Sequence, residues 1–383
     1  MANQALLRRI NLARCMNAIR EHSPLSRSRI ADLLGLDRKS VTNLVGELQS
    51  KGLVYESGKR QTGKGRPLVM LEFRRDRNWV MGLALSATSV DGVLLDLYGD
   101  VVGRARKTFA FEADFVAIQS AVQSCFTALR KHAGDRLLEV GLAVPGIVDP
   151  VAGMVRRSVN VPALEGRPML RLLPAGVCGL AVATEESSRA KALAEKWFGV
   201  ARDVPSFVCV DLGVGIGAGI VQDRRLYAGE TGYVGEIGHT IIERGGAQCR
   251  CGHRGCLEAY VSERVLLDRI GSVEGHSLAS FDQVDVLSPA SVRILEEAGF
   301  RLGVALSYLV NIICPPLIVL SGPLTRFEQH WMRQLAEGLD EGALPACRER
   351  VRLRSSPFSN AGAMGAGARA LADLFEVQGH FYV

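Results

Sequence analysis

The sequence predicts an α/β protein in which a winged helix-turn-helix precedes a body of two α/β lobes. Three observations predict it: a basic N-terminal segment with helix-turn-helix spacing, two widely separated glycine-rich strand pairs, and a late cysteine-rich loop. The 383 residues, 48% hydrophobic and 22% charged, suffice for two or three globular domains. The expected domains are a DNA-binding domain over 1–75, a first lobe over 76–195 and a second lobe over 196–360, with a C-terminal helix over 361–383 that joins the first lobe.

Charge is concentrated at the N-terminus. Residues 1–75 carry 15 Lys and Arg against 6 Asp and Glu, a net +9, whereas residues 76–383 carry 31 against 34, a net −3. This asymmetry favours a reader of polyanions, although a solvated basic face would give the same counts. No apolar run reaches the roughly 18 residues of a membrane span, and the N-terminus lacks the features of a secretory signal. We therefore expect a cytoplasmic protein that does not enter a membrane.

The first fifty residues have apolar side chains at helical spacing in three segments, 5–21, 27–35 and 38–51. Gly35 permits the turn between the second and third helices, and Asp37 is a suitable N-cap for the third. This is the helix-turn-helix pattern, whose third helix presents polar side chains to phosphates and base edges in a major groove. The outward residues expected to contact DNA are Arg38, Lys39, Ser40, Thr42 and Asn43.

A basic hairpin is expected next. Strands over 53–56 and 68–73 flank the glycine-rich loop 57–67, and together they form a wing. Its glycines allow the backbone to approach DNA closely, and Lys64 and Arg66 are the expected wing contacts, with Arg66 suited to a minor groove. The alternative is a helical dimerisation module with a solvated basic loop.

Beyond residue 75 the pattern changes to strands and longer helices. A glycine-rich strand pair over 207–221 repeats the character of the hairpin that opens the body. Two lobes that each begin with a hairpin facing a phosphate are the layout of the actin-like ATPase fold, although close strand packing also selects glycine. The first lobe is expected to contain strands over 79–85, 92–97, 101–105 and 138–144 and a helix over 112–133.

Three of the nine cysteines lie within eight residues, at Cys249, Cys251 and Cys256, and His239 precedes them by ten. Three thiolates and one imidazole predict a closed tetrahedral zinc site, which is structural because no position remains for water. His253 lies inside the loop and competes with His239 as the fourth ligand. Free loop thiols are the alternative. An odd number of cysteines in a cytosolic chain argues against a disulfide framework.

These motifs together resemble the ROK family (repressors, open reading frames and kinases). The resemblance is carried by VPGIVD at 144–149, NVP at 160–162, ALAEKWFG at 192–199, GEIGH at 235–239 and the cysteine loop at 249–258. It covers essentially the whole chain, and with the winged helix the protein looks like the ROK regulators of sugar metabolism. The resemblance implies that sugar hydroxyls are bound by Asn160, Glu236, His239 and Glu258. Carboxylates and amides suit vicinal hydroxyls.

Two departures from the family's kinases argue against catalysis. Those kinases place a general-base aspartate in a Glu-Asn-Asp-x-Asn segment, where this chain has Glu185-Glu186-Ser187-Ser188-Arg189. Ser187 therefore stands at the base position, and a hydroxyl cannot accept the proton as a carboxylate does. The first phosphate loop, Asp-x-Gly-Gly-Thr in the kinases, is replaced by residues 84–88, Ala-Leu-Ser-Ala-Thr. We expect no enzyme activity and no ATP cofactor. Arg189 instead suits a phosphate or carboxylate on the ligand, and a surface arginine without a ligand is the alternative.

The sequence thus predicts a sugar-responsive DNA-binding repressor with a structural zinc ion. Its expected partners are operator DNA, a sugar or sugar phosphate, and further copies of itself in a homodimer or homotetramer. One alternative is a bifunctional ROK sugar kinase that also binds DNA. Another is a DNA-binding protein whose body serves only as a docking platform without a ligand.

Overall fold

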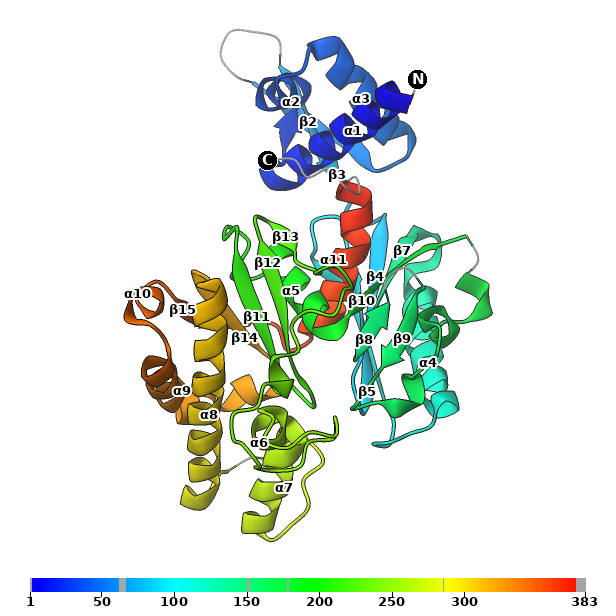
Figure 1. Cartoon of the computed structure of the whole chain (residues 1–383). Helices are drawn as coiled ribbons and strands as arrows, with labels where there is room; N and C mark the ends of the chain where they lie inside the picture. The colour runs from blue at the N-terminus through cyan, green and yellow to red at the C-terminus, as the bar shows by residue number, and fades with distance from the viewer. Residues whose placement is uncertain (1, 62–66, 150–151, 178, 285, 377–383) are drawn as a thin grey trace.

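Figure 1 shows the computed structural model, which describes residues 2–61, 67–149, 152–177, 179–284 and 286–376. The N-terminal module lies above a body of two α/β lobes that stand side by side. Among the described helices, none combines the length and the apolar character needed to cross a bilayer.

The N-terminal module is a three-helix unit with a small sheet. Its helices are α1 (Ala2–His22), α2 (Arg27–Leu34) and α3 (Arg38–Ser50), and its strands β1 (Leu25–Ser26), β2 (Val54–Arg60) and β3 (Leu68–Phe73) pair in the order β1-β3-β2. Gly35 adopts the left-handed conformation that ends α2, and Asp37 accepts a hydrogen bond from the Ser40 amide at the start of α3. The expected turn and cap are therefore present. The two-residue strand β1 was not expected.

The first lobe is a five-stranded sheet covered by a helix on each face. The strand order is β10-β7-β4-β5-β6, and β4 and β7 run parallel. Helix α4 (Phe115–Ala133) packs on one face and α11 (Ala361–Phe375) on the other, because alternate residues of β4 point to opposite faces. The strands are β4 (Trp79–Leu85), β5 (Ser89–Leu95), β6 (Val101–Thr108), β7 (Leu137–Val144) and β10 (Ala181–Glu186), with a side ribbon of β8 (Ile147–Asp149) and β9 (Met154–Arg157).

The second lobe repeats this plan. Its sheet has the order β13-β12-β11-β14-β15, and the long helices α8 (Pro289–Ile313) and α9 (Glu328–Gly342) form the core on one face. The strands are β11 (Phe207–Leu212), β12 (Ile216–Gln222), β13 (Arg225–Leu226), β14 (Leu317–Ser321) and β15 (Arg352–Ser355), and the remaining helices are α6 (Glu258–Val261), α7 (Glu263–Glu274) and α10 (Pro345–Arg348).

Helix α5 (Ser187–Trp197) lies at the centre of the molecule. It packs against α11 of the first lobe and against β11 and β12 of the second. Small residues permit this contact: a Cβ on Gly365 would lie 1.7 Å from the Ala190 carbonyl oxygen. Helix α5 is therefore in direct contact with both lobes.

Several boundaries differ from those expected. The first wing strand, β2, runs Val54–Arg60 instead of 53–56, because its pairing with β3 continues through Arg60 and Leu68, and β6 extends to Thr108 instead of residue 105. Strand β5 begins at Ser89 rather than at residue 92, because Ser86 accepts the Ser89 amide and closes a tight turn before it. Helix α4 begins at Phe115 rather than at residue 112, because Asp114 caps it through the Ala117 amide. The C-terminal helix ends at Phe375, and residues 377–383 lie outside the described part of the chain.

Candidate metal centre, ligand cleft and DNA-binding face

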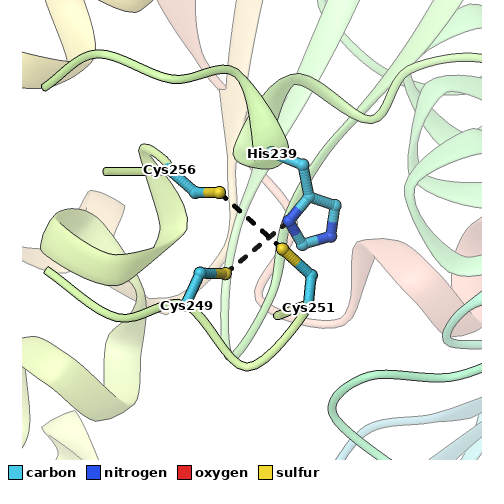
Figure 2. A group of neighbouring side chains, drawn as sticks. All are labelled: His239, Cys249, Cys251 and Cys256. Carbon is cyan, nitrogen blue, oxygen red and sulfur yellow. Dashed lines mark hydrogen bonds between the residues drawn. The ribbon is translucent and has the colours of Figure 1, made fainter. Parts of the chain in front are cut away.

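The predicted zinc ligands meet in the second lobe. His239 ends the short 3-10 helix η5 (Ile237–His239), and the cysteines follow on the loop before α6. Ligand atoms of His239, Cys249, Cys251 and Cys256 all lie within 4.8 Å of one another (Figure 2). His253 approaches Cys251 with an Nδ1 to Sγ distance of 3.5 Å, but it is not a member of this group. The geometry therefore favours His239 as the fourth ligand.

The spacing within this group matches a tetrahedral metal shell. Sγ atoms of Cys251 and Cys256 are 3.7 Å apart, and Cys249 Sγ is 3.8 Å from His239 Nδ1. A tetrahedron with Zn–S distances of about 2.3 Å has edges of about 3.8 Å. Gly255 allows the loop to fold this tightly, since its φ is +83° and a Cβ would lie 1.7 Å from the Glu243 carbonyl oxygen. The four side chains thus form a site that can hold a metal ion.

The residues implied in sugar binding lie close together where the two lobes meet, a region here termed the ligand cleft. Asn160, after β9, donates its amide to Glu258 Oε1 at 3.4 Å, while Glu258 Oε2 accepts the Ile216 amide at 2.9 Å. His239 faces Cys249 through Nδ1, and its Nε2 lies 3.8 Å from Glu236 Oε2. Burial raises the pKa of Glu236. Glycine at 215 leaves room here, because a Cβ there would lie 2.8 Å from the Asn160 amide nitrogen.

A cavity of about 210 Å³ adjoins Asn160 on the side of the first lobe. Glu112 forms part of its wall and is also paired with Arg250 of the cysteine loop, at 2.8 Å. Arg157, on β9, donates to the Cys251 carbonyl oxygen at 3.3 Å. The metal loop is therefore held against the first lobe at two points. The cavity is lined by Ala87, Glu112, Ala113, Asp114, Ile118, Asn160, Val161, Pro162 and Ala163.

Ser187, which is expected to stand at the general-base position of the kinases, is the first residue of α5. Ser187 Oγ is buried, with no hydrogen-bond partner among the described residues. The adjacent Glu186 has a pKa raised to about 7 by its burial. Both of its carboxylate oxygens accept backbone amides, Ser188 at 2.8 Å and Arg189 at 3.0 Å, so the group is used as a helix cap.

Two further charged side chains, both on α5, are already paired. Lys191 donates its ammonium to Asp211, which lies on β11 just before the glycine-rich residues 213–219. Arg189 pairs with Glu185 at 3.0 Å and donates to the Gly232 carbonyl oxygen at 3.1 Å. The Lys191 pair could not be read from spacing, because Lys191 lies on helix α5 and Asp211 on strand β11, twenty residues later.

The residues predicted to contact DNA differ in how exposed they are. Arg38, Lys39, Thr42 and Asn43 are exposed on α3. Ser40 is only half-exposed, and its hydroxyl donates to Asp37 at 2.5 Å, so it serves the cap as well. Strands β2 and β3 form the expected hairpin, whereas Lys64 and Arg66 fall outside the described residues.

Comparison with known proteins agrees with this architecture. The ROK family profile matches residues 80–373. The chain belongs to the ROK family. It is similar to the xylose repressor of Caldicellulosiruptor bescii, with 27% identity over 394 residues covering 98% of both chains. It is also similar to the crystal structure of a ROK family transcriptional regulator described as a homologue of E. coli Mlc, with a TM-score of 0.79, 25% identity and coverage of 96% and 97%.

The family's kinases are similar over less of the chain. The ROK hexokinase of Thermus thermophilus is 27% identical with a TM-score of 0.60, and it covers 77% of this chain while 98% of the hexokinase is matched. The predicted fold, a winged helix followed by a ROK body, is thereby confirmed.

Proposed function

We propose that this ROK protein is a sugar-responsive transcriptional repressor that uses the kinase-like body as a sensor. The observation that carries the proposal is the share of this chain that each relative matches. The named repressor matches the chain from end to end, α3 included, whereas the hexokinase matches only about the length of the body. The exposed basic residues of α3 and the basic N-terminal module support DNA as the partner. DNA as the partner implies a cytoplasmic location.

The effector that we propose is a neutral sugar bound by Asn160, Glu236, His239 and Glu258. These residues offer carboxylate, amide and imidazole groups from both lobes in one cleft. We assign zinc to His239, Cys249, Cys251 and Cys256, because three thiolates and an imidazole suit that ion. Bound zinc would fix the ring of His239 and leave its Nε2 toward the sugar. Two copies of the module, in a homodimer, would read paired half-sites.

We further propose that the body has lost phosphoryl transfer. Ser187 stands in place of the general base, Lys191 already engages the carboxylate of Asp211 beside the second glycine-rich hairpin, and both oxygens of Glu186 accept backbone amides. The alternative kinase reading has one point in its favour: a pKa near 7 is suited to general-base catalysis. ADP release should therefore be measured with each sugar, with Glu186→Gln as the control for any activity found.

The first test is thermal melting of the zinc-loaded protein with D-xylose, D-glucose and other sugars, with and without Mg-ATP. A ligand that binds only the folded state raises the melting temperature. We expect one sugar to raise it and ATP to have no effect. A parallel selection of duplexes from a random pool should recover a paired-site sequence whose affinity falls when that sugar is added. Failure of both arms would overturn the proposal.

A further inference from the structure

The DNA-binding module is attached to the body at a joint centred on Arg20. Arg20 lies in the last turn of α1, and its guanidinium stacks on two rings of the body, 4.1 Å from the centroid of Trp197 and 5.1 Å from that of Phe375. Trp197 is the last residue of α5 and Phe375 the last of α11. Three helix ends thus converge on one cation.

This cation is held in an unusual way. Its side chain is only 15% exposed, and Nε and Nη1 are buried without a hydrogen-bond partner among the described residues. Burial lowers the pKa of Arg20 to about 10, so it remains charged at neutral pH. Its nearest carboxylate is Glu21, at 3.8 Å. Glu21 and Glu376 also favour the charged form of Arg20, and Arg202 opposes it. The ring faces lie against the guanidinium itself, so the stability of this buried charge depends on where the rings lie.

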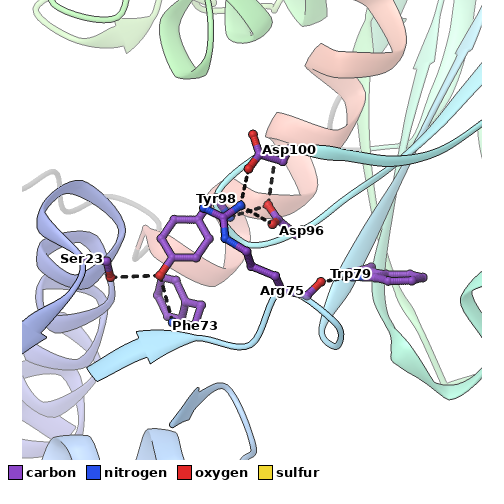
Figure 3. A network of polar contacts seen from close by, with 7 residues as sticks. All are labelled: Ser23, Phe73, Arg75, Trp79, Asp96, Tyr98 and Asp100. Carbon is purple, nitrogen blue, oxygen red and sulfur yellow. Dashed lines mark hydrogen bonds and ion pairs between the residues drawn. The ribbon is translucent and has the colours of Figure 1, made fainter. Parts of the chain in front are cut away.

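A second set of contacts fixes the module beside this cation. Asn17, one turn earlier on α1, donates to the Phe375 carbonyl oxygen at 2.9 Å. The Tyr98 hydroxyl, on the turn after β5, donates to Ser23 Oγ at 2.9 Å and accepts the Phe73 amide at 3.0 Å (Figure 3). Arg75 pairs with Asp96 at 3.2 Å and with Asp100. The module is therefore seated on the body, and a movement of either ring would alter its orientation.

The opposite end of α5 lies against β12 and the chain segment that leads to Glu236. Its first turn is capped by Glu186, and a Cβ on Gly217 of β12 would lie 2.3 Å from Ser188 Oγ. Arg189 is bonded to Gly232, three residues before the GEIGH segment, and Lys191 to Asp211. An eleven-residue helix is about 16 Å long and moves as a rigid rod. Helix α5 thus contacts β12 and the segment before Glu236 through its first turn, and the DNA-binding module through its last residue.

We propose that α5 transmits the binding of a sugar to the DNA-binding helices. Arg20, which stacks on Trp197 at the end of α5, is the positioning residue that links the two. This inference rests on the proposed function. A sugar drawn between Asn160 of the first lobe and Glu236 of the second changes how the lobes close. Helix α5 follows, because β12 and Gly232 hold its first turns. Trp197 then shifts beneath Arg20, and α1 takes a different orientation with α3 attached.

The test compares Arg20→Met, which removes the charge at similar length, with Arg20→Lys, which keeps it. Arg8→Ala is the matched control, because Arg8 is also on α1 but pairs with Glu47 inside the module, at 2.9 Å. For each protein, affinity for the selected duplex is measured with and without the sugar that raises the melting temperature of the wild type. Tryptophan emission is followed in the same titration, with Trp197→Phe identifying the signal of Trp197.

We expect the sugar to weaken DNA binding of the wild type and of Arg8→Ala by about tenfold or more. In Arg20→Met the sugar should weaken DNA binding by less than about threefold, although it should still raise the melting temperature. Arg20→Lys should retain most of the wild-type loss of DNA affinity. The sugar should also change Trp197 emission in the wild type and much less in Arg20→Met. If the sugar weakened DNA binding and changed Trp197 emission in Arg20→Met as much as in the wild type, the inference would be overturned while the proposed function stood. A wild type that selects no duplex and responds to no sugar would overturn the proposed function, and the inference with it.

Discussion

At the residue scale, the molecule's buried carboxyl groups differ in their partners. Glu139, on β7, is 4% exposed, and its Oε1 has no hydrogen-bond partner among the described residues. Burial, together with nearby Asp373, raises its pKa to about 7, and Arg369 opposes both effects. Glu139 lies away from the ligand cleft, at the start of its strand. It is therefore a probe of stability rather than of ligand binding.

Glu139→Gln should make stability less dependent on pH. The unfolded carboxyl titrates near 4.5 and the folded one near 7, so the folded state holds the extra proton between these values. The free energy of unfolding of the wild type therefore falls as pH rises from 4.5 through 7. We expect the variant to be more stable by about 2 kcal/mol at pH 8 and unchanged at pH 4.5. Urea unfolding at both values checks this, with the exposed Glu337→Gln as control. An equal gain at both would contradict the assignment.

Cys256→Ser should remove the metal. With one of four ligands lost, the site no longer has a closed shell, and a structural metal contributes directly to folding free energy. We expect about one zinc per chain in the wild type and almost none in the variant, with the melting temperature lower by about 10 °C. Elemental analysis and melting curves measure both. Cys314→Ser, outside the group, is the control and should keep its zinc. Full zinc occupancy in Cys256→Ser would argue for His253 as a substitute ligand.

At the element scale, α5 and α11 meet through small residues. Besides the Gly365 contact, a Cβ on Gly82 of β4 would lie 2.1 Å from the Ala363 carbonyl oxygen, and one on Gly141 of β7 would lie 1.8 Å from that of Ala366. Helix α11 thus lies almost directly on the backbone of the first sheet and on α5. Such close packing makes these helices rigid and sensitive to a single added methyl group.

Gly365→Ala should destabilise the protein by about 3 kcal/mol, because the added carbon meets backbone that cannot move independently. Gly46→Ala is the matched control, since Gly46 is helical on α3 and has nothing within 4 Å of its added Cβ. The control should gain a few tenths to about 1 kcal/mol from helix propensity. Chemical denaturation of both variants gives the comparison. Equal stability of the two would mean that α11 does not pack on Ala190 as described.

Local signals explain which elements the sequence predicted well. The α2–α3 turn depends on Gly35 and Asp37, and the metal loop on spacing within about twenty residues, so both were readable. Strand β5 was misplaced because its first residue is set by the side-chain hydrogen bonds of Ser86, which period-2 patterns do not report. Strand β1 was missed because two residues carry no periodicity, and only β3, more than forty residues away, defines it.

At the scale of the whole molecule, the informative contacts join residues far apart in sequence. One such contact joins Arg20 of the DNA-binding module to Trp197 at the end of α5, and another joins Lys191 of α5 to Asp211 of the second lobe. No local sequence pattern predicts either pair. The candidate site was readable because family motifs mark Asn160, Glu236 and Glu258. Its coupling to DNA was not, because it depends on the packing of α5 between lobes. The sequence thus predicts the residues that bind ligand and DNA better than the packing that couples the two sites.

The last such contact joins the metal loop to the first lobe across the cleft. Arg250, between two cysteines of the loop, pairs with Glu112 at 2.8 Å, and its guanidinium lies 5.3 Å from the Phe111 ring. Glu112 holds a φ of +61°, which is strained for a residue with a side chain. It also lines the cavity beside Asn160. The pair therefore favours lobes closed around the ligand position.

Arg250→Ala should weaken sugar binding by about two- to fivefold, the effect of a partly exposed ion pair. Arg254→Ala is the matched control: Arg254 lies on the same loop, but its contacts are to Gly245 and Gln248 within it. Calorimetric titration of both variants with the responding sugar, at low and at high salt, measures their sugar affinities and distinguishes them. The Arg250 effect should shrink at high salt, because screening already weakens the pair in the wild type. An equal loss in both variants would attribute the effect to the loop's folding, and lobe closure would then depend on the metal centre rather than on this pair.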